Sequence, residues 1–198
     1  MTLASGGPRR IGVFGGTFDP PHIAHLVAAI EAREVLELDV VLLVVANVPW
    51  QKEGTREISS AEHRLEMVRA CAAEVEGLEV SDMEIRRGDK SYTADTLAEL
   101  LASEPQAELF VIVGRDAAAG FTTWERHDEV AQMASLVVVD RPGQHSEPDP
   151  NHSWIRVDVA DLEISSTDLR ARIKAGRSIK FLIPEGAASV IERLKLYR

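Results

Sequence analysis

The feature that most limits the fold of this chain is a regular alternation of short apolar runs with longer amphipathic segments. The apolar runs are rich in valine, isoleucine and leucine and are short enough to be strands. This order is typical of an open parallel sheet with helices on both faces. Because nearly all the runs lack a polar side, we expect both faces of the sheet to be covered. The sequence therefore predicts an α/β fold.

The strands are predicted at residues 10–14, 40–46, 78–85, 109–113 and 136–140, with a short one at 154–157. The helices are predicted at residues 22–37, 61–75, 94–103, 116–120, 127–133, 167–175 and 185–196, and Pro184 suits the first turn of the last one. The proline-rich segment 141–152 is predicted to be a surface loop. In such a fold, ligands bind at the carboxyl ends of the strands, where the strand order reverses.

The length of 198 residues and the hydrophobic fraction of 45% suit one domain over residues 1–198. Within it, we expect a flexible N-terminus at 1–9 and a helical C-terminal part at 165–198. The longest apolar run is strand-sized and the N-terminus has no signal-like apolar stretch, so a cytoplasmic location is expected. The single cysteine, Cys71, agrees with a reducing compartment and is expected to pack in the core from a helix.

The net charge of −10 argues against broad nucleic-acid binding, which depends on basic groups that neutralise phosphates. A small phosphate ligand remains compatible with this charge. A few backbone N–H groups, cations and a metal ion hold such a ligand locally.

Residues 15–25 read GGTFDPPHIAH and connect the first predicted strand to the first predicted helix. Gly15 and Gly16 let the backbone approach an anion closely, because they carry no side chain. The helix start adds unsatisfied N–H groups and the positive end of the macrodipole. The segment therefore predicts a phosphate-binding turn, although it has neither the G-x-G-x-x-G spacing of dinucleotide-binding enzymes nor the terminal Lys-Ser/Thr of a P-loop.

His22 and His25 are three residues apart and share one face of the predicted helix. Both imidazoles can donate hydrogen bonds to one phosphate, and its charge would favour their protonated forms. Half of a metal site would have the same spacing, but no third ligand accompanies the pair. We expect electrostatic stabilisation of phosphate charge without a covalent enzyme intermediate. Asp19 either orients substrate or water, or serves only the turn before Pro20.

Residues 164–170 read ISSTDLR and place three hydroxyls at a helix start, with Arg170 about one turn later. Serine and threonine are favoured N-caps, so the segment is in the first place a well-capped helix. The same atoms also suit a second anion cradle, in which Arg170 holds two oxygens. The residues alone leave both interpretations open.

Residues 15–25 resemble the G-G-T-F-D-P-x-H-x-G-H signature of the nucleotidylyltransferase superfamily, with Ala24 in place of the usual glycine. Residues 164–170 resemble the I-S-S-T-x-x-R motif of the same superfamily, in the expected order. The resemblance implies a Rossmann-like sheet of five to six strands with a small helical C-terminal part. It also implies an ATP site formed by Gly15, Gly16, Thr17, Phe18, His22, His25, Gly114, Asp116, Ile164, Ser165, Ser166, Thr167 and Arg170.

Residues 91–97 (SYTADTL), residues 114–116 (GRD) and Trp124 lie between the two motifs. Thr93 looks like a capped helix start, and Trp124 either stacks on a flat ring or packs in the core. All three segments resemble those that hold the substrates in bacterial nicotinate-nucleotide adenylyltransferases. By that resemblance, Thr93 and Trp124 contact the nicotinate ring. The implied mononucleotide site comprises Gly16, Asp19, Lys52, Thr93, Trp124 and Arg141.

Residues 48–52 read VPWQK where many members of that family have P-P-H-K, so a familiar histidine is missing. Lys52 is expected to meet the substrate phosphate. Trp50 either closes over the site or covers apolar surface. His22 favours pyridine nucleotides, because related pantetheine-phosphate adenylyltransferases typically carry threonine at that position.

The resemblance implies adenylyl transfer from ATP to nicotinate mononucleotide, which yields deamido-NAD and pyrophosphate in NAD biosynthesis. The mononucleotide phosphate would attack the α-phosphate directly, with His22, His25 and Arg170 as catalytic groups. Mg²⁺ would enter with ATP rather than through protein side chains. The alternatives are nicotinamide mononucleotide or another acceptor such as phosphopantetheine, and a non-catalytic nucleotide-binding module. No nucleic acid or membrane partner is expected, and homo-oligomer formation is left open.

Overall fold

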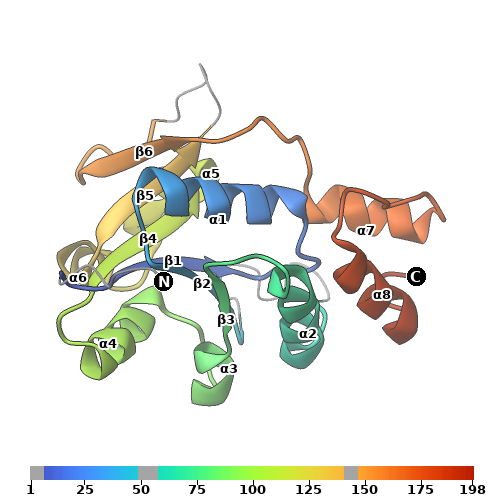
Figure 1. Ribbon diagram of the computed structural model, residues 1–198, viewed down its shortest axis with the longest axis horizontal. Helices are drawn as coiled ribbons and strands as arrows, with labels where there is room; N and C mark the ends of the chain where they lie inside the picture. The colour runs from blue at the N-terminus through green and yellow to red at the C-terminus, as the bar shows by residue number, and fades with distance from the viewer. Residues whose placement is uncertain (1–6, 49–57, 141–146) are drawn as a thin grey trace.

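The computed structural model describes residues 7–48, 58–140 and 147–198. Over these residues, the strands form one six-stranded sheet in the order β3-β2-β1-β4-β5-β6, and every neighbouring pair is parallel (Figure 1). The strands are β1 (Arg10–Gly16), β2 (Val40–Val45), β3 (Leu78–Ser81), β4 (Glu108–Gly114), β5 (Ser135–Asp140) and β6 (Trp154–Asp158). The order reverses between β1 and β4, so a crevice is expected where their carboxyl ends diverge.

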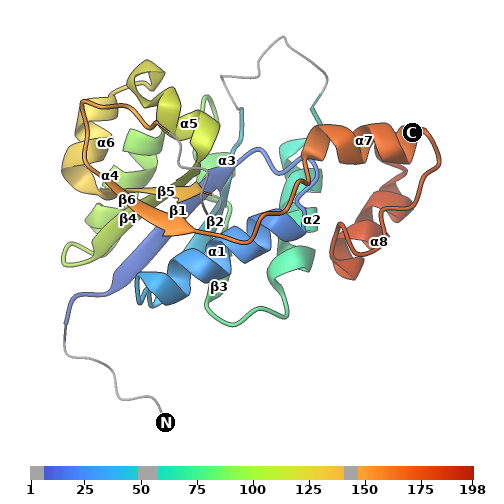
Figure 2. The same cartoon turned by 90° about the horizontal axis from the view of Figure 1, so that it is seen from above.

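The helices are α1 (Ile23–Val35), α2 (Ala61–Ala72), α3 (Met83–Arg87), α4 (Thr93–Ser103), α5 (Arg115–Ala119), the 3₁₀ turn η2 (Phe121–Thr123), α6 (His127–Met133), α7 (Ser166–Lys174) and α8 (Glu185–Leu194). Helix α1 lies along one face of the sheet, and α3 and α4 lie on the other (Figure 1). Helices α7 and α8 sit together at the end of the molecule opposite α6 (Figure 2). Within the described residues, no helix has the length and apolar character needed to cross a bilayer.

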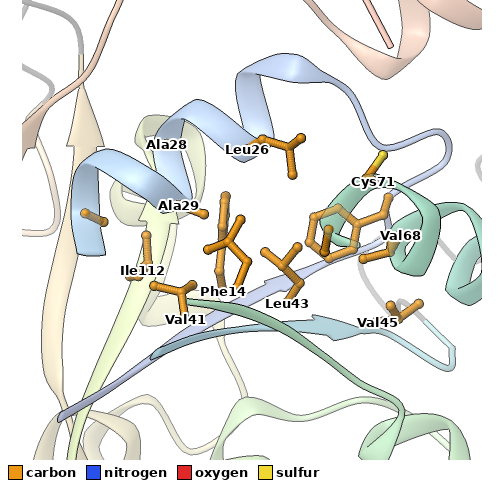
Figure 3. Close-up of a cluster of buried hydrophobic side chains, with 14 of the residues drawn as sticks. Phe14, Leu26, Ala28, Ala29, Val41, Leu43, Val45, Val68, Cys71 and Ile112 are labelled. Carbon is orange, nitrogen blue, oxygen red and sulfur yellow. The ribbon is translucent and has the colours of Figure 1, made fainter. Parts of the chain in front are cut away.

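Two apolar clusters cover the two faces of the sheet, which confirms the Rossmann-like α/β prediction. Figure 3 shows the first cluster, where Phe14, Val41 and Leu43 of the sheet pack against α1 and α2. Cys71 of α2 lies in this cluster, as predicted, and burial raises the pKa of its thiol to about 12. On the other face, side chains of α4, η2 and α6 pack against alternate strand residues such as Val111. The continuous apolar runs of the sequence follow from this double coverage.

The strand predicted at residues 78–85 is wrong in its second half. The strand β3 ends at Ser81, and α3 begins two residues later. Asp82 precedes α3, and its carboxylate accepts a hydrogen bond from Nε of Arg86 at 2.8 Å. Aspartate is a poor strand residue, and an acidic and a basic side chain four residues apart favour a helix. The pairing of Asp82 with Arg86 across one turn of helix therefore outweighs the apolar alternation that predicted a strand in this segment.

Candidate active site

Two cavities open where the carboxyl ends of the central strands diverge. The smaller cavity has a volume of about 270 Å³, and the larger one about 640 Å³. Both are lined by Phe14, Gly16, Thr17, Gly114 and Ala117. The end of β1 and the end of β4 therefore form a wall that the two cavities share, and molecules bound in each would meet there.

The larger cavity brings together nearly all of the residues predicted to bind ATP. It is lined by Gly16, Thr17, Phe18, His22, His25, Gly114, Asp116, Ile164, Ser165, Ser166, Thr167 and Arg170. Gly15 lines the smaller cavity instead. Asp19 also lines the larger cavity, although the sequence assigned it to the mononucleotide.

Direct hydrogen bonds join the two phosphate motifs, which are far apart in the sequence. The hydroxyl of Ser166 donates to the carbonyl oxygen of Pro20 at 2.8 Å, and Nη1 of Arg170 donates to the carbonyl oxygen of Asp19 at 2.8 Å. The carboxylate of Asp19 is buried and accepts a hydrogen bond from the hydroxyl of Tyr197 at 2.7 Å. The two motifs thus form one rigid wall of the cavity.

The imidazole rings of His22 and His25 are stacked, with centroids 3.7 Å apart and planes inclined by 24°. The backbone N–H of His22 donates to Nδ1 of His25 at 3.2 Å, so a neutral His25 carries its proton on Nε2. The ring of Phe18 packs against His25 at a centroid distance of 5.1 Å. These contacts fix the ring of His25 with a donor on the nitrogen away from the backbone.

His22 occupies the N-cap position of α1 and is only 6% exposed. Its Nδ1 is buried and has no hydrogen-bond partner among the described atoms. Burial lowers the pKa of His22 to about 4, so the ring is neutral at pH 7 while no anion is near. A bound phosphate would oppose this shift and supply the missing partner.

The glycine turn after β1 has a steric requirement at one of its two glycines. A Cβ at Gly16 would lie 2.7 Å from Cζ of Phe18, whereas a Cβ at Gly15 or Gly114 would meet nothing within 4 Å. Phe18 is itself buried, with φ of 50°. Gly16 is therefore needed so that the Phe18 ring can pack beneath the turn, and Gly15 and Gly114 leave open space.

The second motif caps α7, as its composition predicted. The hydroxyl of Ser165 accepts a hydrogen bond from the backbone N–H of Asp168 at 3.1 Å. Nη2 of Arg170 donates to the hydroxyl of Thr167 at 3.1 Å, which aligns the guanidinium with the helix start. The capping geometry and the position on the cavity wall thus coexist in one segment.

The smaller cavity contains Thr93 and Trp124, the two residues assigned to the nicotinate ring. Thr93 is the first residue of α4, and the cap position belongs to Tyr92, which makes no side-chain cap, so the predicted capping role of Thr93 is wrong. The indole ring of Trp124 packs against Phe121 at a centroid distance of 5.4 Å. Its Nε1 is buried and has no hydrogen-bond partner within the described part of the chain.

Glu84 is a wall residue of the smaller cavity that sequence reasoning missed. Its buried carboxylate accepts a hydrogen bond from the hydroxyl of Thr96 at 2.7 Å. Residue 84 was predicted to lie inside a strand, so its carboxylate was not expected to line the smaller cavity. The signal in the sequence was an acidic residue shortly after Ser81 and Asp82, where the strand ends.

Arg64 of α2 is a second residue that the sequence analysis missed. It is 1% exposed, and its guanidinium donates to the carbonyl oxygens of Ser59, Thr17 and Asn47, each at 2.9 Å. These carbonyls belong to the glycine turn, the end of β2 and the approach to α2. The signal in the sequence was an arginine in helical register with buried Val68 and Cys71.

Two of the predicted site residues, Lys52 and Arg141, lie outside the described residues, and so does Trp50, whose role was left open. Their assignments stay predictions of the sequence.

Comparison with known proteins agrees with this geometry. A cytidylyltransferase-like family model matches residues 13–172. A probable nicotinate-nucleotide adenylyltransferase of Exiguobacterium sibiricum is 40% identical, over 95% of this chain and 98% of its own length. A probable nicotinate-nucleotide adenylyltransferase of Thermus thermophilus is 43% identical, over 96% of this chain and all of its own length.

Solved structures show the same fold. Nicotinic acid mononucleotide adenylyltransferase of Plasmodium falciparum, complexed with NaAD, superposes with a TM-score of 0.78 at 17% identity, over 96% of this chain and 97% of its own. A structure from Vibrio parahaemolyticus, described as that of a putative nicotinate-nucleotide adenylyltransferase, gives a TM-score of 0.70 at 19% identity, over 96% of both chains. The chain belongs to the cytidylyltransferase-like family and, within it, to the nicotinate-nucleotide adenylyltransferases.

Proposed function

We propose that this protein transfers the adenylyl group of ATP to nicotinate mononucleotide and thereby forms deamido-NAD and pyrophosphate in NAD biosynthesis. The observation that carries the proposal is the pair of cavities that share the wall at Gly16 and Gly114, with both phosphate motifs on the larger one. Its curated relatives are named as enzymes of this activity. The Plasmodium falciparum enzyme was solved in complex with NaAD and with APC.

In this arrangement, ATP lies in the larger cavity, with its phosphates between the histidine pair and residues 164–170. The mononucleotide lies in the smaller cavity, with its ring beside Trp124 and Thr93 and its phosphate toward the shared wall. ATP enters as its Mg²⁺ complex, because this ion is usually bound through substrate phosphates. Lys52 and Arg141 extend the mononucleotide site in this proposal.

The chemistry is one displacement at the α-phosphorus. An oxygen of the mononucleotide phosphate forms a bond to the α-phosphorus of ATP, and the bond from that phosphorus to the bridging oxygen of the β-phosphate breaks. Pyrophosphate leaves with the electron pair. His22, His25 and Arg170 donate hydrogen bonds to oxygens whose charge increases in the transition state. No side chain acts as a nucleophile.

The larger cavity supports this distribution of roles. His25 has its Nδ1 occupied by a backbone N–H and keeps Nε2 as a donor. His22 has a buried nitrogen with no partner, which a phosphate oxygen would satisfy when the ring is protonated there. We also propose that the reaction takes place in the cytoplasm, as the single buried thiol of Cys71 suggests.

The decisive experiment compares nicotinate and nicotinamide mononucleotides as substrates with Mg-ATP at steady state, with release of pyrophosphate as the readout. We expect a higher kcat/KM for the nicotinate form. Absence of pyrophosphate with both substrates would reject the proposal. Turnover only with a phosphopantetheine acceptor would identify another adenylyltransferase, and ATP binding without turnover on any acceptor would identify a non-catalytic module.

A further inference from the structure

A cluster of three side chains lies at the start of α6, beside the segment that leads into β6. His127 and Asp128 are the first two residues of α6, and His152 comes two residues before β6. One ligand atom from each of the three lies within 4.8 Å of the others. None of the three lines either of the substrate cavities. The cluster is therefore separate from the site proposed for adenylyl transfer.

The spacing of these atoms fits a tetrahedral metal ion. Oδ1 of Asp128 lies 3.2 Å from Nδ1 of His127 and 3.4 Å from Nε2 of His152. Metal–ligand bonds of about 2.0–2.2 Å in a tetrahedron separate neighbouring ligand atoms by about 3.3–3.6 Å. Two of the three ligand separations are thus close to those that a metal ion such as Zn²⁺ imposes, and the third, between the two histidine nitrogens, is at most 4.8 Å.

Hydrogen bonding accounts for only one of these two short distances, and only at its outer limit. Nδ1 of His127 is buried and has no hydrogen-bond partner among the described residues, although it lies beside the carboxylate of Asp128. The contact between His152 and Asp128, at 3.4 Å, is at the long limit for a hydrogen bond. Two ring nitrogens thus gather around one carboxylate oxygen without a well-formed bond to it, and a cation between them would satisfy all three groups.

The surroundings of His152 leave one ring nitrogen available for a metal. Its Nδ1 is hydrogen-bonded to the buried carboxylate of Asp149. A carboxylate only accepts, so Nδ1 carries the proton and a neutral ring turns the lone pair of Nε2 toward Asp128. Asp149 is held in turn by Nδ2 of Asn151 at 2.9 Å and by its own N–H, which donates to the carbonyl oxygen of Ala118 at 3.1 Å. A carboxylate behind a ligating histidine is the usual support of a metal site.

We propose that His127, Asp128 and His152 bind a divalent transition metal ion, with Zn²⁺ as the best match to two imidazoles and one carboxylate and with water as the fourth ligand. The side chain of Asp128 is 75% exposed, so the ion has a path from solvent. The metal joins the start of α6 to a segment that is more than twenty residues later in the chain. The proposal does not depend on the proposed function.

The test uses the full chain without an affinity tag, stripped of metal by a chelator and then dialysed. Zn²⁺ is titrated in, with Tm and calorimetric binding as readouts, and Co²⁺ is used in parallel because its visible absorption reports tetrahedral coordination. We expect saturable binding that raises Tm, since a ligand of the folded state stabilises it.

The informative variant is Asp128→Asn, because this exposed side chain can change without disturbing the core. Its matched control is Glu129→Gln, the next residue of the same helix, whose side chain is 55% exposed. We expect Asp128→Asn to weaken Zn²⁺ binding by at least about tenfold. Glu129→Gln should keep the wild-type affinity and Tm shift.

A further variant, Asp149→Asn, should weaken Zn²⁺ binding about 10–100-fold through loss of the support behind His152. The proposal is overturned if the wild-type protein gives no saturable shift in Tm, or if Asp128→Asn binds Zn²⁺ as tightly as Glu129→Gln does. The second result would place any bound metal elsewhere, for example on the His22 and His25 pair.

Discussion

His22 and His25 both line the larger cavity, but they do so in different states although their rings are stacked on one another. His25 has a fixed tautomer, because Nδ1 accepts the backbone N–H of His22. His22 is more deeply buried and has a nitrogen without a partner. The sequence suggested an equivalent pair. The structure gives the two rings different surroundings on the wall of the larger cavity.

We expect His22→Ala and His25→Ala each to lower kcat more than they raise the KM for the mononucleotide. Hydrogen bonds to the transferring phosphate become stronger as charge develops in the transition state, so their loss affects the chemical step. The fall in kcat should be roughly 10²-fold for each variant. Steady-state kinetics with both substrates varied provide the measurement. A rise in KM with an unchanged kcat would assign the pair to ground-state binding alone.

The depressed pKa of His22 also affects stability. Its ordinary pKa is 6.5, and burial lowers the pKa in the folded protein to about 4. Between these values the unfolded chain binds a proton that the folded chain does not. The contribution of the neutral buried ring to the free energy of unfolding is therefore fully present above about pH 6.5 and is lost as the pH falls toward 4.

We expect His22→Asn to remove this part of the pH dependence. Between pH 7 and pH 4.5, the free energy of unfolding, measured with urea, should fall by about 2.5 kcal/mol more for the wild-type protein than for the variant, because one pKa unit corresponds to about 1.4 kcal/mol. The difference between the two proteins isolates His22 from the carboxylates that titrate in the same range. If the free energies of unfolding of the two proteins changed equally with pH, the result would contradict a neutral His22 in the folded state.

Trp124 offers a flat ring and an unsatisfied indole N–H in the smaller cavity. We expect Trp124→Ala to raise the KM for the mononucleotide roughly tenfold, since an aromatic contact contributes about 0.5–1.5 kcal/mol. Trp124→Phe should show a smaller rise, because it keeps a ring and loses only the N–H donor. The KM for ATP should stay unchanged, because Trp124 does not line the larger cavity. If only the KM for ATP changed, the indole ring would contact ATP and not the mononucleotide, which would contradict this assignment.

At the scale of elements, α2 supports the active site through Arg64. One guanidinium holds the glycine turn, the end of β2 and the approach to α2 in fixed positions. The helix itself is anchored by apolar contacts with the sheet and with α8. Arg64, a buried cation on a packed helix, thereby fixes three segments that lie outside the regular secondary structure.

We expect Arg64→Met to lower the free energy of unfolding by roughly 3 kcal/mol or more, because several hydrogen bonds from a charged donor are lost in a buried place. The matched control is Arg69→Met on the same helix. Arg69 is 57% exposed and pairs with Asp82, so its loss should cost under about 1 kcal/mol. Urea denaturation measures both. Equal effects would show that the buried bonds of Arg64 add nothing beyond helix packing.

At the scale of the whole molecule, the C-terminal part closes against the start of the fold. The carbonyl oxygen of Leu182 accepts the N–H of Ile23 at 3.1 Å, and Tyr197 donates to Asp19. Burial, together with Asp19, raises the pKa of Tyr197 above its usual range, so the hydroxyl remains a donor. Chain segments at opposite ends of the sequence thus hold the phosphate motif from both sides.

We expect Tyr197→Phe to lower the free energy of unfolding by about 1–2 kcal/mol through loss of this hydrogen bond. A double-mutant cycle with Asp19→Asn separates the pair from the other contacts of each residue. Urea unfolding of the four proteins should give a coupling of about 1 kcal/mol. Fully additive effects would mean that the bond contributes no net stability.

The sequence by itself determined the alternating α/β order, the two phosphate motifs and their family, because strand and helix periodicities and glycine turns are local properties of the chain. Through resemblance it also assigned Thr93 and Trp124 to one site, and in the structure both residues line the smaller cavity. It missed the end of β3, because the apolar alternation of residues 78–85 masked the Asp82–Arg86 pair, which favours a short helix.

Only the tertiary structure decided how distant segments share one site. The sheet order brings the ends of β1 and β4 together and creates the wall between the cavities. The hydrogen bonds of Arg64 with Thr17 and of Tyr197 with Asp19 join residues far apart in the chain, and no local pattern encodes these pairings. The cluster of His127, Asp128 and His152 has the same origin, because its geometry exists only after α6 packs beside the segment before β6.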